Sequence, residues 1–188
     1  MSTFDHRFMV TQDELVAEDP FVQIRRKSAV FAATGKEATY LFTQMKNPGY
    51  VLVCARLKDG CFVLTRQVRL ATGGATVDFV AGGRKEDESW EEAASRELRE
   101  EVGLRPTTLI AAGQAYNQTD RLDNFCMLYL ALECVEVEQP TTADEVQPVE
   151  RIVWTEQQVR QAIANGKIVD MATKLGFYAH LLHEHGLL

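Results

Sequence analysis

The sequence lacks several features, and each absence narrows the class of protein. No apolar run is long enough to cross a bilayer, so no membrane-spanning helix is expected. There are only four cysteines and no C-x-x-C pair, which favours buried free thiols over a zinc site or disulfide framework. Basic residues are outnumbered, and the net charge of -7 argues against a nucleic-acid partner. The acidic first twenty residues lack the basic and apolar parts of a secretory signal, so we expect a cytoplasmic protein.

The chain does contain many apolar runs of strand length. Its 188 residues, 46% of them hydrophobic, suit one compact domain with a small accessory element. A hairpin is predicted around "KDG", between residues 50–57 and 61–70. Further strands are predicted at residues 21–32, 75–82, 107–116, 125–137 and 151–155. The first of these belongs to an N-terminal segment that ends near the turn signal at Pro48.

Three helices are predicted after or between these strands. The best marked covers residues 90–102, with Ser89 and Glu92 as a capping box and Gly103 at its C-terminal end. A second follows the N-cap Thr155 and ends at Gly166.

The third predicted helix lies near the C-terminus. Its apolar residues at helical spacing are Met171, Leu175, Tyr178 and Leu182. The run "HLLHEH" places His180 and His183 in this helix, where we expect an exposed helix end rather than a metal site.

The helix at residues 90–102 carries an unusual concentration of carboxylates. On a helical wheel of about 100° per residue its apolar stripe consists of Trp90, Ala94, Leu98 and Val102. Glu101 projects inside that stripe, Glu97 lies at its edge and Glu100 just beyond it. A carboxylate that points toward the protein body needs a cation, because an unpaired buried charge is expensive.

Two interpretations of this helix follow. It is either a solvated charged helix or a binding site for a hard divalent cation such as Mg²⁺ or Mn²⁺, which prefers oxygen ligands. The glycine-containing turn "VAGG" just before the helix favours the second, since it lets backbone approach a ligand closely. Arg96 can reach Glu100 at the i,i+4 spacing or brace Glu97 from beside it.

Residues 82–104, "GGRKEDESWEEAASRELREEVGL", reproduce every fixed position of the Nudix box, G-x5-E-x7-R-E-U-x-E-E-x-G-U with U apolar. The chain therefore resembles the Nudix hydrolases. This resemblance implies an α/β fold, an α/β/α sandwich around a mixed sheet, together with Mg²⁺ or Mn²⁺ as cofactor. It also implies cleavage of a nucleoside diphosphate linked to another group.

The resemblance assigns roles to individual residues. Glu97, Glu100 and Glu101 are candidate metal ligands, and the carbonyl of Ala81 or Gly82 is a further candidate. Arg96 would orient a glutamate, and Glu88 would support the loop. The implied chemistry is sound, because metal ions neutralise a pyrophosphate and lower the pKa of an attacking water.

The flanking sequence resembles the ADP-ribose pyrophosphatase and nucleotide-sugar branch of that family. The run "QVR" at residues 67–69 and the run "DFVAG" at residues 78–82 are similar to two of its motifs. They make Arg69, Asp78 and Gly82 candidate substrate-binding residues. In the acidic loop "TTADEVQPVE", Glu145 is the candidate catalytic base, with Asp144 and Glu150 nearby.

One segment departs from that branch. Several of its enzymes have Pro-Gly shortly after the box, where this chain has "YNQTDRLDN". Tyr116, Asp120 and Arg121 then belong either to a different sugar or base pocket or to a polar loop.

We expect a Mg²⁺-dependent pyrophosphatase of ADP-ribose or a related nucleoside diphosphate sugar, releasing a nucleoside monophosphate and a sugar phosphate. The alternatives are a hydrolase of non-standard nucleoside triphosphates and a nucleotide-sensing domain without turnover. The resemblance further implies two parts, a strand-rich segment at residues 1–48 that helps form a homodimer and a Nudix domain at residues 49–188. The expected partner is a small nucleoside diphosphate derivative.

Overall fold

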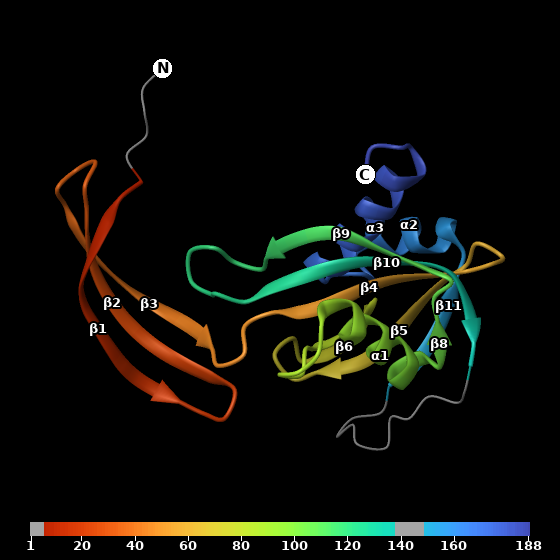
Figure 1. Cartoon of the computed structure of the whole chain (residues 1–188), viewed down its shortest axis with the longest axis horizontal. Coiled ribbons are helices and arrows are strands. Elements are labelled where there is room, and N and C mark those ends of the chain that lie inside the picture. The colour runs from red at the N-terminus through yellow and green to blue at the C-terminus, as the bar shows by residue number, and fades with distance from the viewer. Residues whose placement is uncertain (1–5, 138–148) are drawn as a thin grey trace. The chain divides into compact units, whose positions relative to one another are not determined.

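A computed structural model describes residues 6–137 and 149–188 of the chain. The strands are β1 (Phe8–Glu18), β2 (Val22–Phe31), β3 (Glu37–Met45), β4 (Tyr50–Leu57), β5 (Phe62–Arg69), β6 (Gly74–Asp78), β7 (Val80–Gly83), β8 (Leu104–Arg105), β9 (Thr108–Tyr116), β10 (Phe125–Glu136) and β11 (Glu150–Trp154). The helices are α1 (Trp90–Val102), α2 (Glu156–Ala164) and α3 (Met171–Glu184). These elements form two compact units, and the smaller one combines the N-terminal strands with the β9–β10 connection (Figure 1).

The smaller unit is a three-stranded antiparallel sheet in the order β1-β2-β3. Ion pairs across the strands tie β1 to β2, with Asp13 bonded to Arg25 at 2.7 Å and Glu14 to Arg26 at 2.8 Å. Within the same unit the amide of Met45 on β3 donates to Asp123 Oδ1 at 2.8 Å. Of this sheet only β2 was predicted from the sequence, because β1 is exposed along its whole length and β3 in part, so neither has the pattern of a half-buried strand.

The larger unit is a mixed sheet covered by helices on both faces, which confirms the predicted α/β/α sandwich. Its strand order is β11-β5-β4-β10-β8, with β6, β7 and β9 paired to β5, β4 and β10. β4 and β5 form the predicted antiparallel hairpin, whereas β4 and β10 run parallel.

The core of this unit is divided by the sheet. Val51, Val53 and Ala55 of β4 pack with the buried face of α1. Leu52 and Cys54, which point to the other face, pack with residues of α2 and α3. This alternation is the period of two that a strand covered on both sides requires.

Helix α1 has the ends that the sequence predicts. The Ser89 hydroxyl accepts a hydrogen bond from the Glu92 amide, the Glu92 side chain accepts from the Ser89 amide, and Gly103 ends the helix with φ of 67°. Thr155 caps α2 in the same way, through Gln158. Both helices are therefore fixed by local signals.

Helix α3 forms where it was predicted, but its apolar stripe faces outward. Met171, Leu175, Tyr178 and Leu182 are 57%, 37%, 49% and 45% exposed. The face toward the sheet consists mainly of small residues together with Phe177 and His180. Gly176 explains why this face packs on the sheet. An added Cβ there would lie 2.8 Å from Leu52 Cδ2, so the helix lies too close to β4 for larger side chains.

Two further expectations are corrected. The predicted strand at residues 75–82 is broken at Phe79, whose amide donates to Thr173 Oγ1 at 3.2 Å, so that β6 and β7 pair with different neighbours. His180 is fully buried rather than exposed, with its ring 4.9 Å from that of Phe62.

The free cysteines are confirmed, and three of the four are buried. Within residues 6–137 and 149–188, no helix is both long enough and apolar enough to cross a membrane.

Candidate active site

The acidic helix α1 meets β7 at a point where backbone and carboxylate are in close contact. Pairing with β4 fixes β7, and Gly82 lies opposite Val51 in that register. An added Cβ on Gly82 would lie 2.1 Å from Glu97 Cδ and 2.2 Å from Glu97 Oε1. Only glycine leaves room for the Glu97 carboxylate, which explains the first fixed position of the box.

Two carboxylates of α1 are buried, as the helical wheel predicts for one of them. Glu97 is 9% exposed and Glu101 is 7% exposed. They are four residues apart and so lie one turn apart on the same face of the helix. Burial of two like charges at this spacing is unfavourable unless positive charge is close.

Arg96 supplies part of that positive charge and connects four groups. Its Nη1 donates to Glu97 Oε1 at 2.7 Å and to Glu100 Oε2 at 2.9 Å. Its Nε and Nη2 donate to the two oxygens of Glu88 at 2.8 and 3.0 Å, and Nη2 also donates to the Gly83 carbonyl at 2.8 Å. The hydrogen bonds to Glu88 contribute most to raising the pKa of the Arg96 guanidinium, and those to Glu97 and Glu100 add to it. Arg96 therefore connects Glu97 and Glu100 of the helix to Glu88 and Gly83 of the preceding loop, and its role in orienting a glutamate stays a prediction.

Glu88 is a structural residue of this loop. Besides Arg96, it accepts a hydrogen bond from the Lys85 amide at 3.1 Å. The hydrogen bonds from Arg96 lower the pKa of the Glu88 carboxyl, with a smaller contribution from the Lys85 amide. Glu88 thus stays ionised and keeps the loop against the helix.

The residues present suit a hard divalent cation. Glu97 and Glu101 offer buried carboxylate oxygens, and the close approach of the Gly82 backbone to Glu97 places peptide groups beside them. Glu100, which shares the Arg96 hydrogen bonds with Glu97, is less buried, with its side chain 35% exposed. Across the part of the chain that the structure describes, no three Asp, Glu, His or Cys side chains are gathered into a metal-binding group. The oxygen donors present are of the kind that a divalent cation binds, whereas the assignment of all three glutamates as metal ligands stays a prediction.

A second polar cluster lies on β5 and β6 and includes two of the predicted substrate-binding residues. Asp78 is 6% exposed, and its Oδ2 accepts from Thr76 Oγ1 at 2.7 Å and from Arg69 Nη2 at 3.4 Å. Within the described residues, the buried Oδ1 of Asp78 has no hydrogen-bond partner. Burial raises the pKa of the Asp78 carboxyl, an effect that the bonds from Thr76 and Arg69 partly offset.

Thr76 was not identified from the sequence. It lies two residues before Asp78 on the same strand, so both side chains leave the same face of the sheet. That spacing is the signal that would have identified it.

Other predicted residues have separate positions. Glu145 and Asp144 lie outside the described residues. Glu150 forms an exposed ion pair with Arg66 at 2.8 Å. Tyr116, Asp120 and Arg121 belong to the smaller unit, where Arg121 lies 5.2 Å from the ring centroid of Tyr40.

Comparison with known proteins agrees with the box and with the fold. The family model of the NUDIX domain matches residues 45–170. The chain belongs to the Nudix family and is an enzyme of the Nudix pyrophosphatase type.

Several individual proteins are similar to it. An ADP-ribose pyrophosphatase of Bacillus subtilis (strain 168) is 27% identical over 129 residues, which cover 69% of this chain and 70% of that protein. An ADP-sugar pyrophosphatase of Mus musculus is 32% identical over 108 residues, covering 53% of this chain and 49% of that protein, so the match spans about half of the mouse protein. The crystal structure of an ADP compounds hydrolase matches the whole of both chains with a TM-score of 0.82 at 19% identity, which shows the fold.

Proposed function

We propose that this enzyme hydrolyses the pyrophosphate bond of ADP-ribose or a related nucleoside diphosphate sugar, with Mg²⁺ or Mn²⁺ as cofactor. The observation that carries the proposal is the pair of buried carboxylates, Glu97 and Glu101, beside the backbone of Gly82. The names of the relatives support the substrate class. The products would be a nucleoside monophosphate and a sugar phosphate.

The residues of α1 and β7 would hold the metal. Glu97 and Glu101 supply carboxylate oxygens, the Ala81 carbonyl supplies a peptide oxygen, and Glu100 joins them. When bound, the metal neutralises the diphosphate and lowers the pKa of the attacking water. Arg96 keeps Glu97 in a fixed orientation through its fork of hydrogen bonds.

Arg69 and Asp78 would recognise the substrate. The Arg69 side chain is 45% exposed, and its planar guanidinium suits phosphate oxygens. The buried Oδ1 of Asp78 can accept a hydrogen bond from a sugar hydroxyl, which would satisfy an atom that the described residues leave without one. Glu145 is the proposed base that accepts the proton of the attacking water.

A homodimer built through residues 1–48 forms part of the same proposal. The β1–β3 sheet exposes apolar side chains, including Phe8, Met9 and Leu41 at 61%, 65% and 48%. Aromatic residues of this sheet also line an apolar hollow of about 380 Å³ on the smaller unit. A three-stranded sheet with this much exposed apolar surface gains stability when it is covered. Light scattering at working concentration should report a dimer, and a monomer would count against this part of the proposal.

The test of the substrate class uses one panel of compounds. The protein is incubated with Mg²⁺ and nucleotide sugars, dinucleotides and nucleoside triphosphates, and products are identified by mass spectrometry. Release of sugar phosphate supports the proposal, whereas release of inorganic pyrophosphate from triphosphates identifies the rival activity.

Two variants test the assigned residues. Glu101→Gln should lower turnover by orders of magnitude in a folded protein, because it removes a ligand charge and little volume. Glu86→Gln, at an exposed glutamate in the loop before α1, is the matched control and should keep wild-type turnover. Glu145→Gln tests the base, and a negligible rate change would move that role to another carboxylate.

A further inference from the structure

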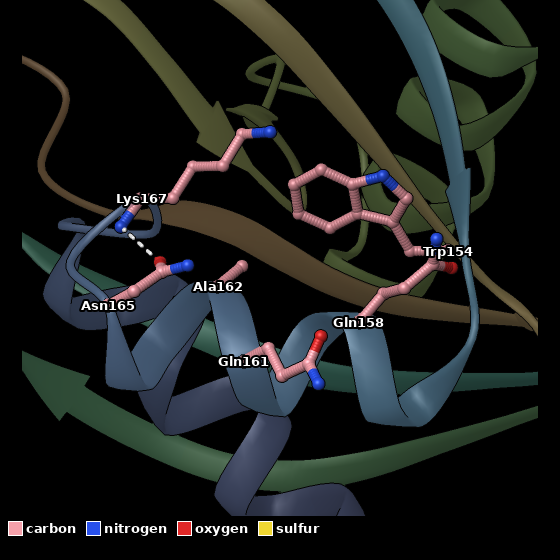
Figure 2. Close-up of a pocket in the computed structure, with 6 residues that line it drawn as sticks. All are labelled: Trp154, Gln158, Gln161, Ala162, Asn165 and Lys167. Atoms are coloured by element: carbon pink, nitrogen blue, oxygen red, sulfur yellow. Dashed lines mark hydrogen bonds between the residues drawn. The ribbon is translucent and has the colours of Figure 1, made fainter.

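A polar hollow lies between the end of β11, helix α2 and the loop that follows it. Its volume is about 180 Å³, and it is lined by Trp154, Gln158, Gln161, Ala162, Asn165 and Lys167. Figure 2 shows the four residues from Gln158 to Asn165 along one side and Trp154 and Lys167 on the other.

The hollow is on the opposite face of the sheet from the carboxylates of α1. Trp154 packs against the core cluster that contains residues of α2 and α3. Helix α1 packs in the other cluster, with Val51 and Val53. A ligand in the hollow would therefore not compete for the space beside Glu97 and Glu101.

Two of the carboxamides that line the hollow have their oxygens engaged by the backbone. The Gln158 Oε1 already accepts from the Thr155 amide at 2.8 Å, and the Asn165 Oδ1 accepts from the Lys167 amide at 3.2 Å (Figure 2). With these two oxygens bonded to backbone donors, Gln158 and Asn165 each have their NH₂ group left for a ligand.

A positive charge completes this set. The Lys167 ammonium lies 4.9 Å from the centroid of the Trp154 ring, and no carboxylate lines the hollow. Among the residues that the structure describes, Lys167 forms no ion pair with an acidic side chain. A hollow lined by an ammonium and by amide NH₂ groups, with no carboxylate in its lining, favours an anion.

We propose that this hollow binds a phosphate group, at a site separate from the catalytic one. The volume admits a compact ligand, and a phosphate has enough oxygens to accept from the ammonium and from more than one amide. A carboxylate, with two oxygens, would satisfy fewer of these donors. The inference does not depend on which diphosphate the enzyme cleaves.

Indole N–H NMR signals provide the test, because the chain has only two tryptophans, Trp90 and Trp154. Trp154→Phe assigns the signal of the ring in the hollow. The full-length protein is titrated with inorganic phosphate, with glycerol phosphate and with acetate in magnesium-free buffer, at an ionic strength held constant with sodium chloride. We expect the Trp154 signal to shift and saturate at about millimolar phosphate, and the Trp90 signal to stay in place.

Charge removal gives the decisive comparison. Lys167→Met should weaken phosphate binding at least about tenfold, whereas Lys58→Met, an exposed lysine in the β4–β5 turn, should leave it unchanged. Tighter binding of inorganic phosphate or of glycerol phosphate identifies free phosphate or a phosphate ester as the source, and either supports the site. An equal response to acetate, no response beyond that to sodium chloride, or unchanged binding in Lys167→Met would overturn the proposal.

Discussion

The carboxylate of Glu97 occupies the space that a side chain on Gly82 would need, because an added Cβ would lie 2.1 Å from Glu97 Cδ. Gly82→Ala should therefore displace Glu97 and lower kcat by about a hundredfold, since a shift of about 1 Å at a catalytic group has an effect of this size. Gly83→Ala is the matched control, because nothing lies within 4 Å of its added Cβ. Steady-state kinetics on both variants check this, and equal turnover would show that the contact is not required.

Arg96 should not be replaceable by lysine. Its guanidinium group donates hydrogen bonds to Glu88, Glu97 and Glu100 at once, and a single ammonium group cannot reproduce that geometry. Arg96→Lys should lower kcat at least about tenfold and the free energy of unfolding by about 1–3 kcal/mol. The exposed Arg99 serves as the control position, where Arg99→Lys should be nearly neutral. Urea unfolding and turnover are measured on the same samples.

Asp78→Asn should separate stability from binding. Burial raises the pKa of Asp78, so the folded state binds more protons than the unfolded state, and stability is lost as pH rises from about 3.8 through the folded pKa. The asparagine variant has no carboxyl group to ionise at this position, so it does not lose stability in this way as the pH rises. It should be at least as stable as wild type at pH 7, while KM for the diphosphate sugar increases about tenfold because a charged acceptor is gone. An unchanged KM would place Asp78 outside the substrate site.

His180 should make stability depend on pH on the acidic side. Desolvation lowers its pKa, and the nearby Arg56 lowers it further, against the attraction of Glu184 at 4.0 Å. The unfolded state then binds more protons, so the free energy of unfolding should fall by up to about 1.4 kcal/mol per pH unit below about 6.5. His180→Phe should flatten this slope and His183→Gln should not. Identical slopes for wild type and His180→Phe would contradict the assignment.

Substitutions on the outer and inner faces of α3 should have very different effects on stability. Leu175→Gln should change the free energy of unfolding by no more than about 0.5 kcal/mol, because the side chain is already 37% exposed and lies on the outer face. Phe177→Ala, which empties a fully buried position, should cost about 3–5 kcal/mol. Thermal unfolding of the two variants gives the comparison, and a large loss for Leu175→Gln would show that this face is covered.

Local signals in the sequence were enough to predict helix α1 and a buried glutamate on it. Capping residues and the helical wheel identified α1 and its inward Glu101, because both depend on residues within a few positions of one another. The burial of His180 depends instead on distant residues, namely Phe62 and the close packing of Gly176 against Leu52. The contact between Arg69 and Asp78 likewise requires the β5–β6 pairing, which no local pattern specifies.

The parallel pairing of β4 with β10 also affects how the protein emerges during synthesis. β4 ends at Leu57, but its partner begins only at Phe125, so the hairpin and the acidic helix leave the ribosome before one edge of β4 is covered. Until β10 follows, that apolar edge is open to chaperones or to strands of neighbouring nascent chains. Slow translation across the intervening segment would prolong this exposure, and faster translation would shorten it.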